Sequence, residues 1–178
     1  SITGSATTAV YQTILQGIQY NDTSDQPTTT SRTISVVAND GTTASATQTV
    51  TLTVAAVNDA PVNTLPASFT TSASAPIPLS GLSIADVDAL SGTITTTLSV
   101  TSGTLSATTG GSVTVTGSGT SSIMLSGTLA NVNAFLASTA PNFASPAAGS
   151  VTLTMLTNDG GNTGGAALTA RLIEAVLA

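Results

Sequence analysis

The chain contains no Cys, no His, no Lys and no Trp. Without Cys it forms no disulfide and carries no thiolate nucleophile, and without His it has neither a Ser-His-Asp triad nor an ordinary zinc site. Without Lys it has no Schiff-base nucleophile and no Lys–Asn cross-link. We therefore expect no enzyme, and we expect rigidity to come from something other than covalent staples.

Charge is also scarce, at 6% of 178 residues. The only cations are Arg32 and Arg171, against eight acidic residues, which gives a net charge of −6. Nucleic-acid binding needs clustered Lys or Arg, so no nucleic-acid partner is expected. No apolar run reaches the roughly 18 residues that a membrane-spanning helix needs. No secretory signal is visible, so we expect a mature chain or an excised segment without a membrane span.

The residues that are present favour β-structure. Hydrophobic residues make up 40% of the chain but aromatic residues only 3%, so any core is built from Val, Ile, Leu and Ala. Apolar and hydroxyl residues alternate in Val50–Val54 and Val113–Val115. Such alternation is typical of half-buried strands and argues against disorder. The sequence predicts an all-β fold.

A nine-residue segment occurs twice. Thr33–Gly41 reads TISVVANDG and Thr152–Gly160 reads TLTMLTNDG. Both segments predict a strand that ends in an Asn-Asp-Gly turn. Apolar residues at helical spacing precede each copy. They are Tyr11, Ile14, Leu15 and Ile18 before the first copy and Leu129, Val132, Phe135 and Leu136 before the second.

The repeat divides the chain into two units. Residues 62–178 predict a complete sandwich, with strands near 62–70, 77–84, 92–101, 111–117, 121–127, 149–157 and 166–175 and a short helix at 128–138. Residues 1–57 supply only a helix and the last two strands, around Ile34 and Val36 and from Val50 to Val54. They are interpreted as the C-terminal half of a similar domain, joined to the complete one by the linker 58–61.

Three motifs carry a resemblance to a known family. They are Asn58-Asp59-Ala60-Pro61, Ala85-Asp86-Val87-Asp88-Ala89 and Asn158-Asp159-Gly160. In this order they resemble the cadherin-like, Ig-like tandem repeats of large bacterial surface adhesins. The resemblance implies a Greek-key cadherin/Ig-like β-sandwich with the short helix in its E–F crossover. It also implies Ca²⁺ bound by linker and DxD acids between successive domains.

Strand order supports such a site independently. If the first strand of the complete domain leads away from the linker, antiparallel order returns the second and sixth strands to the linker end. That end would collect Asn58, Asp59, Asp86, Asp88 and Asp159, and the crossover of the first unit would add Asp22 and Asp25. Ca²⁺ takes 6–8 oxygen ligands in flexible geometry, which suits this set. The alternative is that each Asp forms only an Asx-turn in a solvated loop, and for Asp40 that interpretation is preferred.

The sequence thus predicts a non-catalytic structural or adhesive repeat of an extracellular, cell-surface bacterial protein, stiffened by Ca²⁺. Its partners would be neighbouring domains, copies of itself, or a cell-surface or matrix ligand. The alternative is a filament subunit whose half-domain is completed by strands from another copy. A glycosidase built on Asp86 and Asp88 is disfavoured, because neighbours on one turn seldom flank a substrate.

Overall fold

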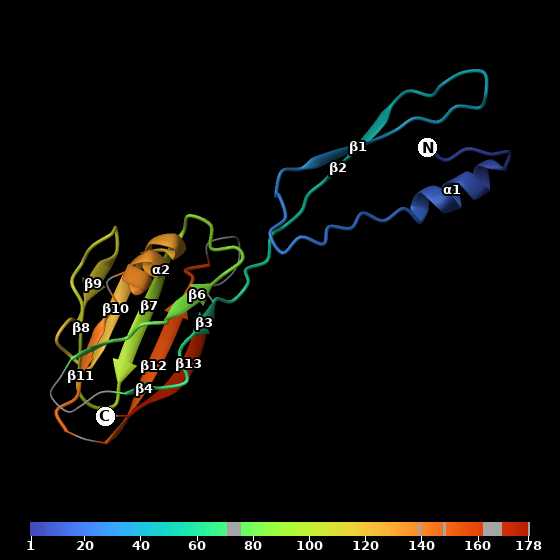
Figure 1. Ribbon diagram of the computed structural model, residues 1–178. Coiled ribbons are helices and arrows are strands. Elements are labelled where there is room, and N and C mark those ends of the chain that lie inside the picture. Colours follow the sequence, from blue (N-terminus) through green and yellow to red (C-terminus); the bar gives the residue numbers. More distant parts are fainter. Residues whose placement is uncertain (71–75, 139, 148, 162–168, 178) are drawn as a thin grey trace.

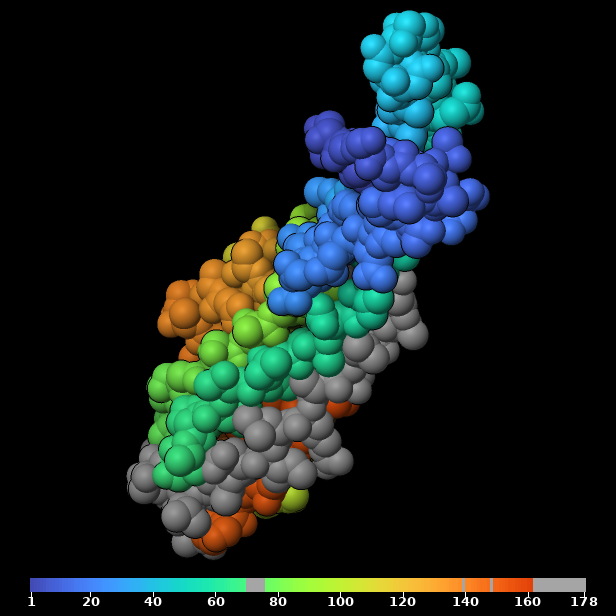
Figure 2. All heavy atoms as spheres, turned by 90° about the vertical axis from the view of Figure 1, so that its right-hand side faces the viewer, coloured from blue at the N-terminus to red at the C-terminus, as the bar shows by residue number. Residues whose placement is uncertain are grey.

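The computed structural model describes residues 1–70, 76–138, 140–147, 149–161 and 169–177. A β-rich body holds the chain from β3 onward, and the N-terminal residues extend from it as a separate arm (Figure 1). Seen from the side, the tip of the arm's hairpin projects beyond the rest of the chain (Figure 2). Among the described residues, no helix has both the length and the apolar character needed to cross a membrane.

A six-stranded sheet forms one layer of the body, in the order β4-β13-β12-β7-β10-β9. Its pairs are antiparallel apart from β13 with β4. The bounds are β4 Phe69–Thr70, β7 Thr93–Val100, β9 Thr114–Thr116, β10 Ser122–Thr128, β12 Ser150–Asn158 and β13 Thr169–Leu177. The central strand β7 alternates buried residues, three of them apolar and the fourth Thr96, with more exposed hydroxyl residues, and this pattern sends one face of the sheet into a core.

Shorter elements cover that face. One small sheet has the order β5-β11-β8 and the other pairs β3 with β6. The bounds are β3 Val62–Thr64, β5 Ile77–Pro78, β6 Ser83–Ala85, β8 Thr104–Ser106 and β11 Asn142–Ala144. Leu105 and Phe143 from the small sheet join Leu98, Leu125 and Leu153 from the large one in a single buried cluster. The body is therefore sandwich-like, with a core lying between its layers.

Helix α2 (Leu129–Ser138) closes one side of this core. Its start is capped by Thr128, whose Oγ1 accepts a hydrogen bond from the Asn131 N–H at 3.3 Å. Val132, Phe135 and Leu136 are buried. The Asn133 side chain is bonded to both backbone groups of Ile84, accepting from its N–H at 2.9 Å and donating to its carbonyl at 2.8 Å. The helix thereby anchors β6, the strand that leads into Asp86.

The arm contains α1 (Thr8–Gln16) and an antiparallel hairpin of β1 (Arg32–Val36) and β2 (Gln48–Leu52). Its apolar residues are not buried. The helix buries none of its side chains, and Ile34, Val36 and Val50 are exposed on the hairpin. The local elements predicted for residues 1–57 therefore form without a core of their own.

The prediction of an all-β fold is confirmed at the level of class, because antiparallel sheets dominate the chain. The Greek-key connection and the division into one complete and one incomplete domain stay predictions. Several expected strands differ in detail. The strand expected at 62–70 is split into β3 and β4, and that at 77–84 into β5 and β6. Strands β8 and β11 were not predicted. Each has only three residues, with one buried apolar side chain, which is too short a segment to show an alternating pattern.

Candidate functional site at the linker

The linker is held to the Asn-Asp-Gly turn that follows β12. The Asn58 side-chain amide donates to Asp159 Oδ2 at 2.7 Å, although the two residues are 101 positions apart. Asp159 Oδ1 accepts the Gly161 N–H at 2.8 Å, which closes the turn. Both residues are buried, with 8% of Asn58 and 1% of Asp159 exposed. A charged residue so deeply buried, and hydrogen-bonded on both oxygens, fixes the direction in which the chain enters the body.

The Asp86-Val87-Asp88 turn reaches the same linker from β6. Asp86 Oδ1 accepts the N–H groups of Asp88 at 3.2 Å and of Ala89 at 3.0 Å, so the motif folds as an Asx-turn. Asp88 Oδ2 then accepts the Asp59 N–H at 3.0 Å. Only 2% of Asp88 is exposed. Acidic groups from the linker, from the turn after β6 and from the turn after β12 therefore gather at one end of the sandwich-like body.

At this end of the body, the ionised form of the Asp86 carboxyl is disfavoured. Burial raises the pKa of the Asp86 carboxyl above its ordinary value, and the neighbouring Asp88 carboxyl raises that pKa further. Among the described residues, Asp86 Oδ2 is buried and receives no hydrogen bond. A buried oxygen in that position is stabilised by a proton or by a cation.

Strand pairing and a small polar network position these turns. Strands β3 and β6 are antiparallel, with Val62 opposite Ala85, so the linker and the turn after β6 leave the sheet at the same end. Thr157 on β12 donates to Asn63 Oδ1 on β3 at 2.7 Å. Its Oγ1 also lies 3.1 Å from Thr96 Oγ1 on β7. Because the Thr157 hydroxyl donates its hydrogen to Asn63, the Thr96 hydroxyl must be the donor to Thr157. These hydrogen bonds connect β3, β12 and β7 next to the linker.

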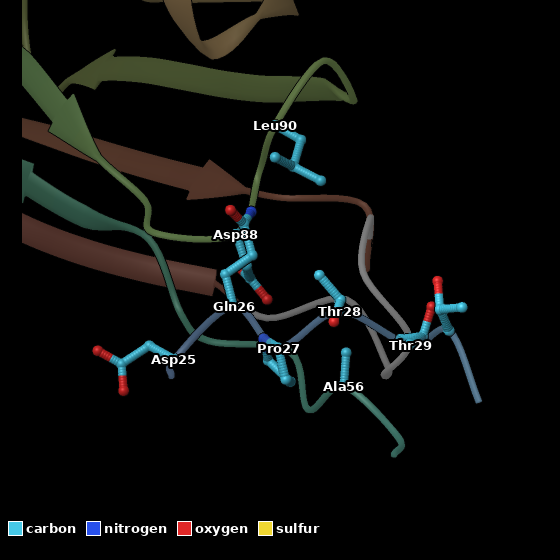
Figure 3. A pocket seen from close by; sticks show the side chains of 9 residues that line it. Asp25, Gln26, Pro27, Thr28, Thr29, Ala56, Asp88 and Leu90 are labelled. Carbon is cyan, nitrogen blue, oxygen red and sulfur yellow. The ribbon is translucent and has the colours of Figure 1, made fainter. Parts of the chain in front are cut away.

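The arm brings Asp22 and Asp25 to the other side of the linker. A pocket of about 300 Å³ is lined by Asp22, Asp25 and Asp59, together with apolar residues such as Val54 and Val57. A second, of about 590 Å³, is lined by Asp25 and Asp88 and by Gln26–Thr30. In Figure 3 the carboxylate of Asp25 points away from Asp88. The two units thus share pockets at the linker, but their acids are not all directed at one point.

Arg32 organises the crossover between α1 and β1, a role that its sequence context does not reveal. Its guanidinium forms an ion pair with Asp22 at 3.2 Å and donates to the carbonyls of Thr28 and Thr30 at 3.0 and 3.1 Å. It also stacks 5.3 Å from the centre of the Tyr20 ring. Asp22 is therefore already paired with a cation. The single Arg near a strand start and an Asp ten residues earlier is too weak a pattern to reveal this contact.

The seven expected ligands thus fall into three groups. In the body, Asn58 contacts Asp159, while Asp86 and Asp88 share one turn that reaches the linker backbone at Asp59. Asp59 and Asp25 line a pocket beside the linker, and Asp22 is engaged by Arg32. Among the described residues, no three acidic side chains are placed to enclose a metal ion. Asp40 lies apart, and its Oδ1 accepts the N–H groups of Thr42 and Thr43 in an exposed turn, as preferred from the sequence.

No family model matches the chain, and no curated protein matches it. The resemblance to cadherin-like repeats therefore rests on the three motifs alone.

Proposed function

We propose that this chain is a non-catalytic structural or adhesive repeat of an extracellular, cell-surface bacterial protein, built on a cadherin-like Greek-key sandwich and stiffened by Ca²⁺ at the linker. The observation that carries the proposal is the gathering of Asn58, Asp86, Asp88 and Asp159 from three separate stretches at the point where the arm joins the body. A linker that only spaced two units would have no need of buried acids, because carboxylates brought together without a cation repel one another.

The residues present suit a hard divalent cation. They offer only oxygen donors, and the Asp88 carboxyl lies close enough to the partly buried Asp86 carboxyl to raise its pKa. Asn58, Asp59, Asp86, Asp88 and Asp159 would hold the ion from the body. Asp25 would reach it from the arm only after turning its carboxylate toward the linker, and Asp22 only after leaving Arg32. When bound, Ca²⁺ supplies positive charge and oxygen coordination, which ties segments of different units together. The side chains and backbone carbonyls of the linker would adjust to complete its coordination.

Thermal unfolding in excess Ca²⁺ and in EGTA tests the site. An ion that binds only the native state adds RT ln(1 + [L]/Kd), about 2.7 kcal/mol at 100 times Kd. The midpoint should therefore be higher in Ca²⁺. The double variant Asp86→Asn, Asp88→Asn should lose this shift, because neutral amides keep the turn's hydrogen bonds but remove two charges. The matched control Asp40→Asn should keep it. A wild-type midpoint that does not respond to Ca²⁺ would contradict the proposal.

Stiffening is a separate consequence and has its own measurement. The chain has no Cys, so spin labels attach only at introduced positions such as Thr49→Cys on β2 and Thr116→Cys on β9. The distance distribution between the two labels should narrow when Ca²⁺ is added, because the ion joins the arm to the body. If the distance distribution is equally broad in Ca²⁺ and in EGTA, the ion does not stiffen the connection between the arm and the body.

The second candidate is a filament subunit completed by strands from another copy. The specific observation in its favour is the uncovered apolar surface of the arm, with Ile14 and Leu15 on α1 and Ile34 and Val50 on the hairpin all exposed. Electron micrographs and sedimentation of the full chain, with and without EGTA, separate the two candidates. Fibres or oligomers support the filament, whereas a compact monomer over a wide concentration range contradicts it.

A further inference from the structure

One edge of strand β1 has no strand partner among the described residues. In the hairpin, β1 pairs only with β2. Side chains of paired residues lie on the same face of a sheet, so Ile34 and Val36 share a face with Val50 and Leu52, and Arg32 and Gln48 lie at the two ends of that face. The opposite face carries Thr33, Ser35, Thr49 and Thr51. The hairpin is thus an amphipathic ribbon, with exposed Ile34, Val36 and Val50 at the centre of one face and an open edge.

The internal repeat provides a template for that edge. Strand β12 contains the second copy of the nine-residue segment, so Ile34 corresponds to Leu153 and Val36 to Met155. On β12, one edge pairs with β13 and the other with β7, antiparallel, with Leu153 opposite Val100 and Met155 opposite Leu98. The open edge of β1 is the counterpart of the edge that β7 occupies.

The two strands differ in length and in which of their edges are paired. Strand β12 continues to Asn158, and its last three residues pair with Thr97, Thr96 and Thr95 of β7. Strand β1 ends at Val36, although residues 37–39 repeat the same sequence pattern. A strand stays extended where a neighbour takes up its backbone hydrogen bonds. Beyond Val36 the chain stays paired on its β2 side, where Asn39 bridges Ala44 and the Ser45 N–H donates to the Ala38 carbonyl at 2.7 Å, so the edge that corresponds to the β7 side of β12 is the one that stays open.

We propose that the open edge of β1 accepts an antiparallel strand of the β7 type, in the register that places a Val like Val100 opposite Ile34 and a Leu like Leu98 opposite Val36. The donor is a strand of another repeat unit with the alternating pattern of Thr93–Val100. The β7 of this body is not free to act as donor, because β12 and β10 already occupy both of its edges. Main-chain hydrogen bonds give such strand addition its affinity, and alternate side chains give it its register. The inference depends neither on calcium nor on where the protein is located.

The test adds a synthetic peptide of residues 92–101 to the full chain. Hydrogen exchange should slow in residues 32–39 at a one-to-one peptide ratio, and protection should extend past Val36 as β1 lengthens. A peptide of the same composition in shuffled order should have no effect. An absence of protection in β1, or equal protection by the shuffled peptide, would overturn the proposal. So would self-association that buries β1 and prevents the peptide from binding, since the occupant would then be a second copy of the arm.

Two matched variants check the face that receives the peptide. Val36→Asp places a charge on the apolar face and should weaken peptide binding at least tenfold. Ser35→Asp places the same charge one residue earlier, on the opposite face, and should weaken binding less than threefold. Equal losses would contradict the assigned face.

The register can be read with thiols, because the chain has no Cys. The Val36→Cys chain should form a disulfide faster with a peptide carrying Leu98→Cys than with peptides carrying Thr96→Cys or Val100→Cys. Residues directly opposite on paired strands have Cβ atoms about 5 Å apart, and diagonal neighbours are farther away. A different preferred partner would overturn the register.

Discussion

The two copies of the repeated segment share a sequence pattern and a local structure but differ in burial. In Thr33–Gly41 the side chains of Ile34 and Val36 are 41% and 39% exposed, whereas their counterparts Leu153 and Met155 are 0% exposed. Both segments form an antiparallel strand with a partner that follows in the chain. Alternation is enough to build a strand, but only packing against a second layer turns one face into a core.

The Asn-Asp-Gly turns that end the two segments also have the same local hydrogen bonds but different surroundings. Asn39 Oδ1 accepts the Gly41 N–H at 2.7 Å, and Asn158 Oδ1 accepts the Gly160 N–H at 2.8 Å. The first turn lies exposed at the arm's tip, whereas the second is pressed against the linker, where Asp159 meets Asn58. One motif therefore serves as a solvated turn in the arm and as part of the candidate site in the body.

The largest expected difference between the copies is in core stability. Leu153→Ala should lower the free energy of unfolding by about 2–5 kcal/mol, because it leaves a cavity between packed layers. Ile34→Ala should cost less than about 1 kcal/mol, because it removes a side chain that is largely exposed. Urea unfolding of both variants measures the contrast. Equal losses would mean that the first copy is packed in solution, for example by a bound strand.

A smaller contrast is expected at the two Asp residues of the turns. Asp159→Asn puts an amide N–H toward either Asn58 Nδ2 or the Gly161 N–H, so one buried hydrogen bond is replaced by a donor facing a donor. The expected cost is about 1–3 kcal/mol. Asp40→Asn keeps an oxygen for Thr42 and Thr43 and should change stability by less than about 0.5 kcal/mol. The same unfolding assay, in EGTA, checks the pair, and a cost at Asp40 as large as at Asp159 would refute the distinction.

The smallest expected effect is in pH dependence, where body and arm should have opposite signs. Burial and Asp88 raise the pKa of Asp86 above its ordinary 3.8. Its stabilising contribution is therefore fully present below the unfolded pKa and is lost as pH rises through the folded pKa. The backbone N–H groups of Thr43 and Thr42 lower the pKa of Asp40. Its contribution is present above the unfolded pKa and is lost as pH falls through the folded pKa.

Unfolding midpoints of the wild type, Asp86→Asn and Asp40→Asn, measured against pH in metal-free buffer, test these signs. On acidification the wild type should gain stability relative to Asp86→Asn and lose it relative to Asp40→Asn. If acidification changes the stability of the wild type in the same direction relative to both variants, the pKa values of Asp86 and Asp40 are not shifted in opposite directions.

Much of the candidate site was predictable because antiparallel order constrains where loops lie. Placing the first strand at the linker was enough to bring Asp88 and Asp159 to the same end as Asn58. The contacts of Arg32 with Asp22 and Tyr20 were not predictable, since they depend on how an irregular crossover folds back on a strand. The Thr96–Thr157–Asn63 network was also missed, because Thr is usually exposed and its burial here depends on polar partners from other strands.

The sequence by itself determined the local elements of this protein: strands where apolar and hydroxyl residues alternate, α2 where the spacing becomes helical, and turns at each Asn-Asp-Gly. These features depend on interactions between near neighbours, which are the same in both copies of the repeat. Only the tertiary structure decided which copy has a core and which Asp is buried. Burial depends on strands and loops brought from distant parts of the chain, such as β7 beside β12 and the linker beside Asp159. The two copies of the repeated segment thus differ more in the strands and loops that pack against them than in their sequence pattern.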